Sequence, residues 1–229
     1  SHTDISDTDQ TIYVPSIKTT IIDSENGSHN AAADEEITLI DTVRYNGLEV
    51  GRKYSVTGTL VDKATGKEIL DDAGNKITAS NEFTAEKPNG TIEITFKFSG
   101  VSLAGKTTVA FEHMYTDGKE VAVHADLKDE KQTEYFPSVH TTATSNDTED
   151  HVVGANEKVT ITDNVALKAL KLGTEYTLSG ILMDATTGKP IVIDGNTIIA
   201  RRTFTADAHE MNVPLTYELN ASQLAGTTT

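Results

Sequence analysis

Apolar and polar residues alternate along most of the chain with the period of two that is typical of β-strands. Clear examples are TIEITFKF at 91–98, KYSVTGTL at 53–60 and EYTLSGIL at 175–182. Gly-bearing turn sequences separate such runs, among them DDAGNK at 71–76, TDGKE at 116–120 and IDGNT at 193–197. No stretch carries a convincing helical period. The pattern therefore predicts an all-β protein.

The same pattern occurs twice, with an offset of 122 residues. PSIKTTIID at Pro15 matches PSVHTTATS at Pro137, and ITLIDTV matches VTITDNV, which places Asp41 on Asp163. About seven short strands per repeat fit tandem immunoglobulin-like β-sandwich domains. We expect three parts: a tail of a preceding repeat or linker at 1–14, a complete domain at 15–134, and a second repeat lacking its final strands at 137–229.

Composition narrows the function classes. The formal net charge of -16 argues against nucleic acid and anionic membranes as partners, since both attract basic proteins. The chain has no cysteine, so neither disulfides nor thiol chemistry can act. No apolar run is long enough for a transmembrane helix, and no leader sequence opens the chain. If the protein is secreted, its signal and anchor lie outside these residues.

Several polar residues fall on strand faces that should be buried. In an extended PSIKTTIID segment, Thr19 shares a face with Ile17 and Ile21, whereas Thr20 points the other way. Asp41 alternates with apolar neighbours in ITLIDTV, and Asp163 repeats this arrangement. A carboxylate on a core face is costly unless it is paired or protonated. Recurrence in both repeats makes a chance placement less probable.

Glu112 is a second unexpected carboxylate, inside the apolar segment VAFEHMY. His124 and Gln132 follow it eight residues apart in HADLKDEKQT. Taken singly, each of these residues could be an ordinary surface or hydrogen-bonded strand residue. The ordered set of Thr, Asp, Glu, His and Gln is the informative feature.

This set resembles the Thr-Gln ester-bond domains of Gram-positive surface adhesins, also described as VaFE repeats. The similarity covers nearly the whole chain and rests on IKTT, DTVRYNGLEVGRKY, GTLVDKATGK, SLAGKTTVAFEHMY and VAVHADLKDEKQT. The resemblance implies that a Thr of the first strand and a Gln of the last condense into an intramolecular ester with loss of ammonia. It also implies that a His and two acidic residues assist.

Carried onto this chain, the resemblance implies a bond between Thr19 and Gln132, with Thr20 as the alternative nucleophile. His124 would take the hydroxyl proton, because a Thr hydroxyl needs a base to become nucleophilic. Asp41 and Glu112 would share a proton that polarises the Gln carbonyl, and which of them holds it stays open. No metal and no cofactor is expected. The reaction would occur once per domain, so the protein would not be an enzyme with turnover.

The second repeat departs from this pattern. Thr141 and Asp163 are present, but the matching Glu, His and Gln would fall beyond Thr229. We therefore expect no internal ester there and an exposed sheet edge. His2 and Gln10 match the His and Gln of the complete repeat, so residues 1–14 could add to the second repeat of another molecule by strand exchange. An engineered truncation or a split domain is an equally good account.

These features predict a stalk module of a cell-surface adhesin, extracellular and anchored to the cell wall. Its partners would be neighbouring repeats, with a host ligand bound by a tip domain not present here. One alternative is an adhesive β-sandwich that binds a ligand or carbohydrate without a cross-link, although the chain has no Trp for sugar stacking. Another is a hydrolase using Thr19, His124 and Asp41, which would need an open cleft.

Overall fold

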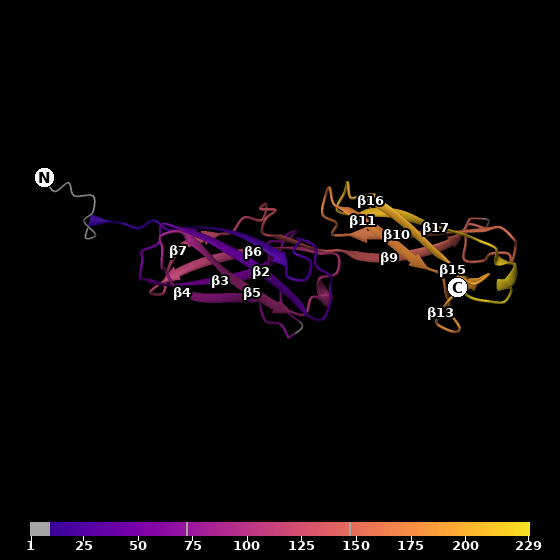
Figure 1. The fold of residues 1–229 in the computed structure, drawn as a ribbon, viewed down its shortest axis with the longest axis horizontal. Helices are drawn as coiled ribbons and strands as arrows, with labels where there is room; N and C mark the ends of the chain where they lie inside the picture. Colours follow the sequence, from indigo (N-terminus) through magenta and orange to yellow (C-terminus); the bar gives the residue numbers. More distant parts are fainter. Residues whose placement is uncertain (1–9, 72, 147) are drawn as a thin grey trace. The chain divides into compact units, whose positions relative to one another are not determined.

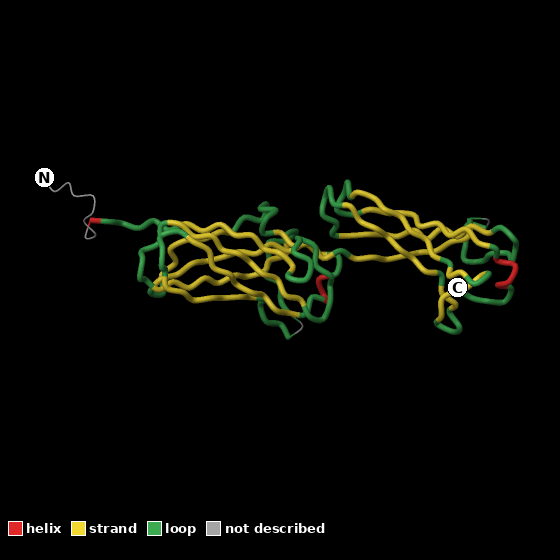
Figure 2. The backbone as a smooth tube through the Cα atoms, viewed as in Figure 1, coloured by secondary structure: helices red, strands yellow, loops and turns green. Residues whose placement is uncertain are grey.

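The computed structural model describes residues 10–71, 73–146 and 148–229, and the fold is all-β, as predicted (Figure 1). The chain divides into two compact units, with the boundary between Phe136 and Pro137. Strands make up most of each unit, and loops and short 3-10 helices connect them (Figure 2). None of the helices in the described residues has the length and apolarity that a membrane span requires.

From Ser16 to the end of the first unit, the described residues form eight strands and the short 3-10 helix η2. Their bounds are β1 Ser16–Asp23, β2 Ile37–Asn46, β3 Lys53–Asp62, β4 Thr78–Thr84, β5 Gly90–Phe98, η2 Val101–Leu103, β6 Lys106–Thr116, β7 Lys119–His124 and β8 Thr133–Phe136. One sheet has the order β1-β2-β5, and the other has the order β4-β3-β6-β7, with β8 also paired to β6. All of these strand pairs are antiparallel.

The core of this unit lies between the two sheets. The inward residues of β2 alternate with half-buried ones as the period of two requires, and Leu39 and Val43 are fully enclosed. Leu60 of β3 and Phe96 of β5 are equally buried and belong to the same apolar cluster. Apolar side chains from both sheets therefore exclude water from the region between them.

Each repeat has a glycine at the same position, Gly58 in β3 of the first repeat and Gly180 in the second, because the opposite sheet comes close there. A Cβ on Gly58 would lie 2.5 Å from Ile94 Cδ1 and 2.6 Å from Phe96 Cζ. Its counterpart Gly180 meets Tyr217 in the same way, with the Oη atom at 2.0 Å. Any larger residue would have to displace core side chains, which explains why the repeat keeps glycine here.

The second unit repeats the first five strands of the first unit. Its elements are β9 Ser138–Ser145, β10 Val159–Lys168, β11 Glu175–Ile181, β12 Met183–Asp184, β13 Lys189–Pro190, β14 Val192–Ile193, β15 Asn196–Thr197, β16 Ile199–Thr205, β17 Met211–Leu219 and η3 Ala221–Leu224. The main sheets have the orders β17-β10-β9 and β11-β16, and two small hairpins pair β12 with β13 and β14 with β15.

The described residues of this unit include no counterparts of β6, β7 and β8. In the first unit β3 pairs with both β4 and β6, whereas β11 pairs only with β16 among the strands that the structure describes. The inward face of β9 is open as a result. Val139 is 61% exposed where its counterpart Ile17 is 5% exposed, and Met183 is 40% exposed where Val61 is 3% exposed.

Candidate functional site

The candidate site lies where edge strand β1 meets β6, β7 and the loop that precedes β8. Thr19 points inward from β1 together with Ile17 and Ile21, and only 3% of it is exposed. Thr20 is half-buried on the other face of the strand. The backbone N–H of Ile21 donates to the carbonyl of Lys131 at 2.9 Å. This bond ties β1 to the loop that carries Gln132.

Three side chains surround the Thr19 hydroxyl. The side-chain Nε2 of Gln132 donates to Thr19 Oγ1 at 2.6 Å. Thr19 Oγ1 in turn donates to Glu112 Oε2 at 2.9 Å, and His124 Nδ1 lies 3.3 Å away. Gln132 Nε2 also donates to Glu112 Oε2. A hydroxyl, a carboxamide, a carboxyl and an imidazole therefore meet around one oxygen atom.

Strand pairing explains why these residues meet. Glu112 and His124 are direct partners in the register of β6 and β7, so their side chains share a sheet face. Gln132 lies next to β6 because its carbonyl accepts a bond from the N–H of Ala110 at 3.0 Å. Glu112 and Gln132 have no exposed surface. The site is thus assembled from distant segments, and its Thr, Glu and Gln are enclosed, whereas the His124 side chain is 19% exposed.

Burial changes the ionisation of the two carboxyl groups. The pKa of Glu112 is raised to about 10. Burial is the largest cause, and the charge and hydrogen bond of Asp41 also contribute. Burial also raises the pKa of Asp41, to about 6, while the nearby Glu112 carboxyl and the Thr20 backbone lower it in part. Near neutral pH, Glu112 therefore keeps its proton and Asp41 is mostly charged.

Asp129 is a further member of the site that the sequence did not indicate. Its Oδ2 lies 3.2 Å from His124 Nε2, and its Oδ1 accepts the backbone N–H of Lys131 at 2.8 Å. A proton on Nε2 shared with Asp129 leaves Nδ1 as the acceptor that faces Thr19. The only sequence signal was the acidic segment after His124, in which Asp126, Asp129 and Glu130 were indistinguishable.

A family of protein domains matches both units of the chain. The family of T-Q ester bond containing domains matches residues 15–135 and 137–229. The chain belongs to this family. No curated protein matches the chain.

Among solved structures, the T-Q domains of this chain resemble a bacterial adhesin from Mobiluncus mulieris containing intramolecular disulfide, isopeptide and ester bond cross-links. In space group P21 the identity is 13% and the TM-score 0.45, over 87% of this chain and 76% of the adhesin chain. In space group P1 the identity is 12% and the TM-score 0.44, over 93% and 96%. A chain described as BspA_C_mut is 10% identical with a TM-score of 0.32, over 93% and 85%.

In the second T-Q domain, Thr141 and Asp163 hold the strand positions of Thr19 and Asp41. Thr141 pairs with Val165 as Thr19 pairs with Val43, and Asp163 pairs with Ala143. Thr141 is exposed, and Asp163 is half-buried, with a pKa raised by burial. The described residues of this domain contain no equivalents of the strands that carry Glu112 and His124 or of the loop that carries Gln132.

The remaining predicted positions lie in the tail. His2 falls outside the described residues, and Gln10 is exposed. Within the described residues, no group of three or more His, Asp or Glu is arranged to hold a metal ion.

Proposed function

We propose that Thr19 and Gln132 form an intramolecular ester that ties the first strand of the domain to its last. The observation that carries this proposal is the enclosed contact of 2.6 Å between Thr19 Oγ1 and Gln132 Nε2, in a domain of the T-Q family. Holding two reacting groups together in this way can supply about 7–11 kcal/mol of the barrier.

The surrounding groups supply the proton transfers. As Thr19 Oγ1 attacks the Gln132 carbonyl carbon, its proton passes to His124 Nδ1, which Asp129 holds in the accepting tautomer. The carbonyl oxygen takes up negative charge, and the protonated Glu112 stabilises it by a hydrogen bond after the amide rotates about its Cγ–Cδ bond. Burial, together with the charge of Asp41, keeps the proton on Glu112.

Collapse of this intermediate breaks the bond between the carbonyl carbon and Nε2. The nitrogen leaves as ammonia with the proton that His124 received, and the carbon keeps its new bond to Oγ1. Each domain reacts once, and no group is regenerated for a second substrate. Self-modification, not turnover, is therefore the proposed chemistry.

The bond would make the domain a stalk module of a cell-surface adhesin. Tension enters the domain at β1 and leaves at β8, whose last residue, Phe136, precedes the second unit. A covalent tie between these two ends would carry the load in place of strand hydrogen bonds. Closing a loop of 113 residues would also stabilise the fold by about 4–5 kcal/mol through restriction of the unfolded chain.

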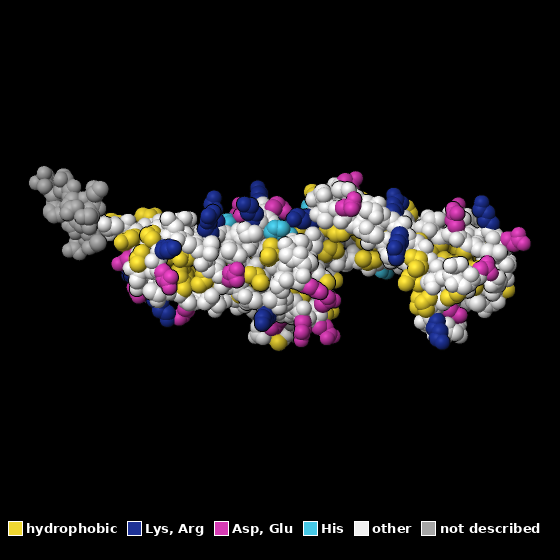
Figure 3. All heavy atoms as spheres, viewed as in Figure 1, with side chains coloured by type: hydrophobic (Ala, Val, Ile, Leu, Met, Phe, Trp, Pro, Cys, Tyr) yellow, Lys and Arg dark blue, Asp and Glu magenta, His cyan; other side chains and the backbone are white. Residues whose placement is uncertain are grey.

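The charge pattern suits an extracellular array. The net charge is -16, and acidic and basic side chains are interspersed on the face drawn in Figure 3. Such a surface would keep crowded repeats soluble. We propose that the protein is extracellular and held at the cell wall.

The intact mass of the denatured protein tests the ester. We expect a deficit of one ammonia relative to the sequence, and a fragment map that joins the peptides of Thr19 and Gln132. A full mass in the unmutated folded chain would contradict the proposal.

The open face of the second domain supports a proposal about its partners, namely that residues 1–14 of another molecule add to it by strand exchange. The exposed inner residues of β9 leave a face for an added segment, since in the first domain the N–H of Ile21 in β1 donates to Lys131 of the segment that residues 1–14 match. Sedimentation should show a concentration-dependent dimer that is lost when residues 1–14 are deleted. Monomers at all concentrations would contradict it.

A further inference from the structure

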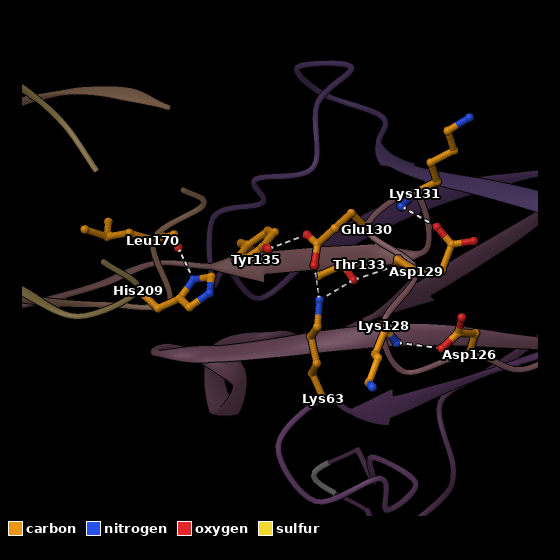
Figure 4. Close-up of polar contacts among 10 residues, drawn as sticks. All are labelled: Lys63, Asp126, Lys128, Asp129, Glu130, Lys131, Thr133, Tyr135, Leu170 and His209. Atoms are coloured by element: carbon orange, nitrogen blue, oxygen red, sulfur yellow. Dashed lines mark hydrogen bonds and ion pairs between the residues drawn. The ribbon is translucent and has the colours of Figure 1, made fainter. Parts of the chain in front are cut away.

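Lys63 reaches from the end of β3 to the loop that carries Gln132. Its Nζ donates to Glu130 Oε1 at 2.6 Å and to Thr133 Oγ1 at 2.9 Å (Figure 4). These two residues lie on either side of Gln132 in the sequence. The side chain of Lys63 is 24% exposed, so this ammonium is better shielded from water than those of the surface ion pairs.

Hydrogen bonds hold the backbone at Lys63 in place. Asp62 Oδ1 accepts the backbone N–H groups of Ala64 and Thr65, both at 2.9 Å, which forms a tight turn. The N–H of Lys63 donates to the carbonyl of Thr107 in β6 at 2.9 Å. The backbone from which the Lys63 side chain extends is therefore fixed to β6.

The loop end of the contact is equally well organised. Tyr135 Oη donates to Glu130 Oε2 at 2.6 Å, so the carboxylate bridges Lys63 and β8 (Figure 4). Thr133 Oγ1 donates to the carbonyl of Asp129 at 2.8 Å. The Nζ of Lys63 also lies 6.0 Å from the centre of the Tyr135 ring.

The same loop carries two members of the proposed reaction. Asp129 contacts His124, and Gln132 contacts Thr19. The N–H of Gln132 donates to the carbonyl of Asp129 at 3.2 Å, so a shift of the loop would move both groups together. A displacement of about 1 Å in a reacting group can cost about 100-fold in rate.

We propose that Lys63 is a positioning residue for ester formation, which it assists by anchoring the loop of Asp129 and Gln132 through Glu130 and Thr133. This inference rests on the proposed Thr19–Gln132 ester. Lys63 touches neither reacting atom, and its role is to hold the loop in the geometry in which the carboxamide faces the hydroxyl.

The second domain indicates that the turn tolerates loss of this side chain. Its residue at the equivalent position is Ala185, and the N–H groups of Thr186 and Thr187 donate to Asp184 Oδ1 at 2.8 and 2.9 Å. Ala185 also donates to the carbonyl of Thr228 at 2.8 Å, as Lys63 does to Thr107. Lys63→Ala therefore introduces the residue that the second domain has in the same turn.

The test compares the rate of ammonia loss in full chains made by cell-free translation, sampled over time into acid and weighed intact. We expect Lys63→Ala to react about 10- to 100-fold more slowly than the unmutated chain. Lys63→Arg should recover most of the rate, since its guanidinium can also donate to Glu130 and Thr133. Lys76→Ala is the matched control, because it removes the exposed Lys76–Glu68 pair of 2.7 Å outside this loop.

Three results would overturn the inference. One is a Lys63→Ala rate equal to that of Lys76→Ala. Another is a slow Lys63→Ala variant that Lys63→Arg does not rescue. The third is a matching loss of folded protein when Lys63→Ala is placed in a Thr19→Ala background, which would assign Lys63 to stability alone. Absence of ammonia loss in the unmutated chain is a separate result, which overturns the ester and this inference together.

Discussion

The hydroxyl oxygen of Thr19 and the side-chain nitrogen of Gln132 lie 2.6 Å apart, although 113 residues separate them in the sequence. The contact is buried, and it joins β1 to the loop before β8. For the proposed ester to form here, the surrounding side chains must accept the Thr19 proton and stabilise the charge on the Gln132 carbonyl oxygen.

Thr19→Ala should abolish the ammonia deficit and destabilise the first domain. By the loop-closure argument, the loss in free energy of unfolding is about 4–5 kcal/mol. Mass spectrometry and thermal unfolding measure the two effects. Thr20→Ala is the control, because this half-buried neighbour faces the other way and should keep the full deficit. A deficit that persists in Thr19→Ala but disappears in Thr20→Ala would move the nucleophile to Thr20.

Glu112→Gln should slow ester formation by about 100- to 1,000-fold, the usual cost of removing a group that stabilises a developing oxyanion. Gln keeps the shape of the side chain but lacks the acidic proton that burial retains on Glu112. Time-resolved intact mass gives the rate. Glu120→Gln changes an exposed carboxylate that pairs with His113 at 2.7 Å, and it should react normally. Equal rates for the two variants would exclude Glu112 from the reaction.

Asp129→Asn should slow the reaction because the imidazole loses the partner that keeps Nδ1 unprotonated. General-base assistance is typically worth about 100- to 10,000-fold, so the effect should approach but not exceed that of His124→Ala. Asp126→Asn in the same acidic segment is the control. Its carboxylate accepts the Lys128 N–H at 2.9 Å, with no contact to His124 among those of the described residues. An unchanged rate in Asp129→Asn would remove it from the site.

Stability should depend on pH in the Thr19→Ala variant, whose site stays unlinked. The folded-state pKa values of Asp41 and Glu112, about 6 and about 10, lie above those of the unfolded chain, near 4. The folded protein therefore holds protons that the unfolded chain has released, and its stability falls as pH rises from about 4 toward 10. Urea unfolding across this range measures the slope. Adding Glu112→Gln should flatten it above pH 6, and an unchanged slope there would contradict the assignment.

Much of this arrangement could be predicted from local patterns. Alternation assigned Thr19 and Asp41 to inward faces, the apolar segment around Glu112 marked that carboxyl as unusual, and all three residues are buried. The offset between repeats placed Gly58 and Gly180 at equivalent positions. Both glycines lie against side chains of the opposite sheet. These features depend on periodicity and internal repetition, which a single sequence records directly.

Other features depend on distances between segments remote in the sequence. Which carboxyl keeps its proton depends on the depth of burial and on the separation of Asp41 and Glu112, and neither quantity is written in the strand pattern. Asp129 and Lys63 were missed because loop and turn residues have no period to assign their direction. Their roles depend on how the loop folds back against β3 and β7.

The short connection between the two units has a mechanical consequence. Only Pro137 separates the end of β8 from the start of β9. In an array where every repeat closes its own ester, the covalent path from Gln132 to Thr141 would contain nine residue steps, against 122 for the full repeat. At about 3.3–3.6 Å per residue, the contour length available to a pulled repeat falls from about 400 Å to about 30 Å. Such a filament would be nearly inextensible and could not dissipate a sudden shock by unravelling.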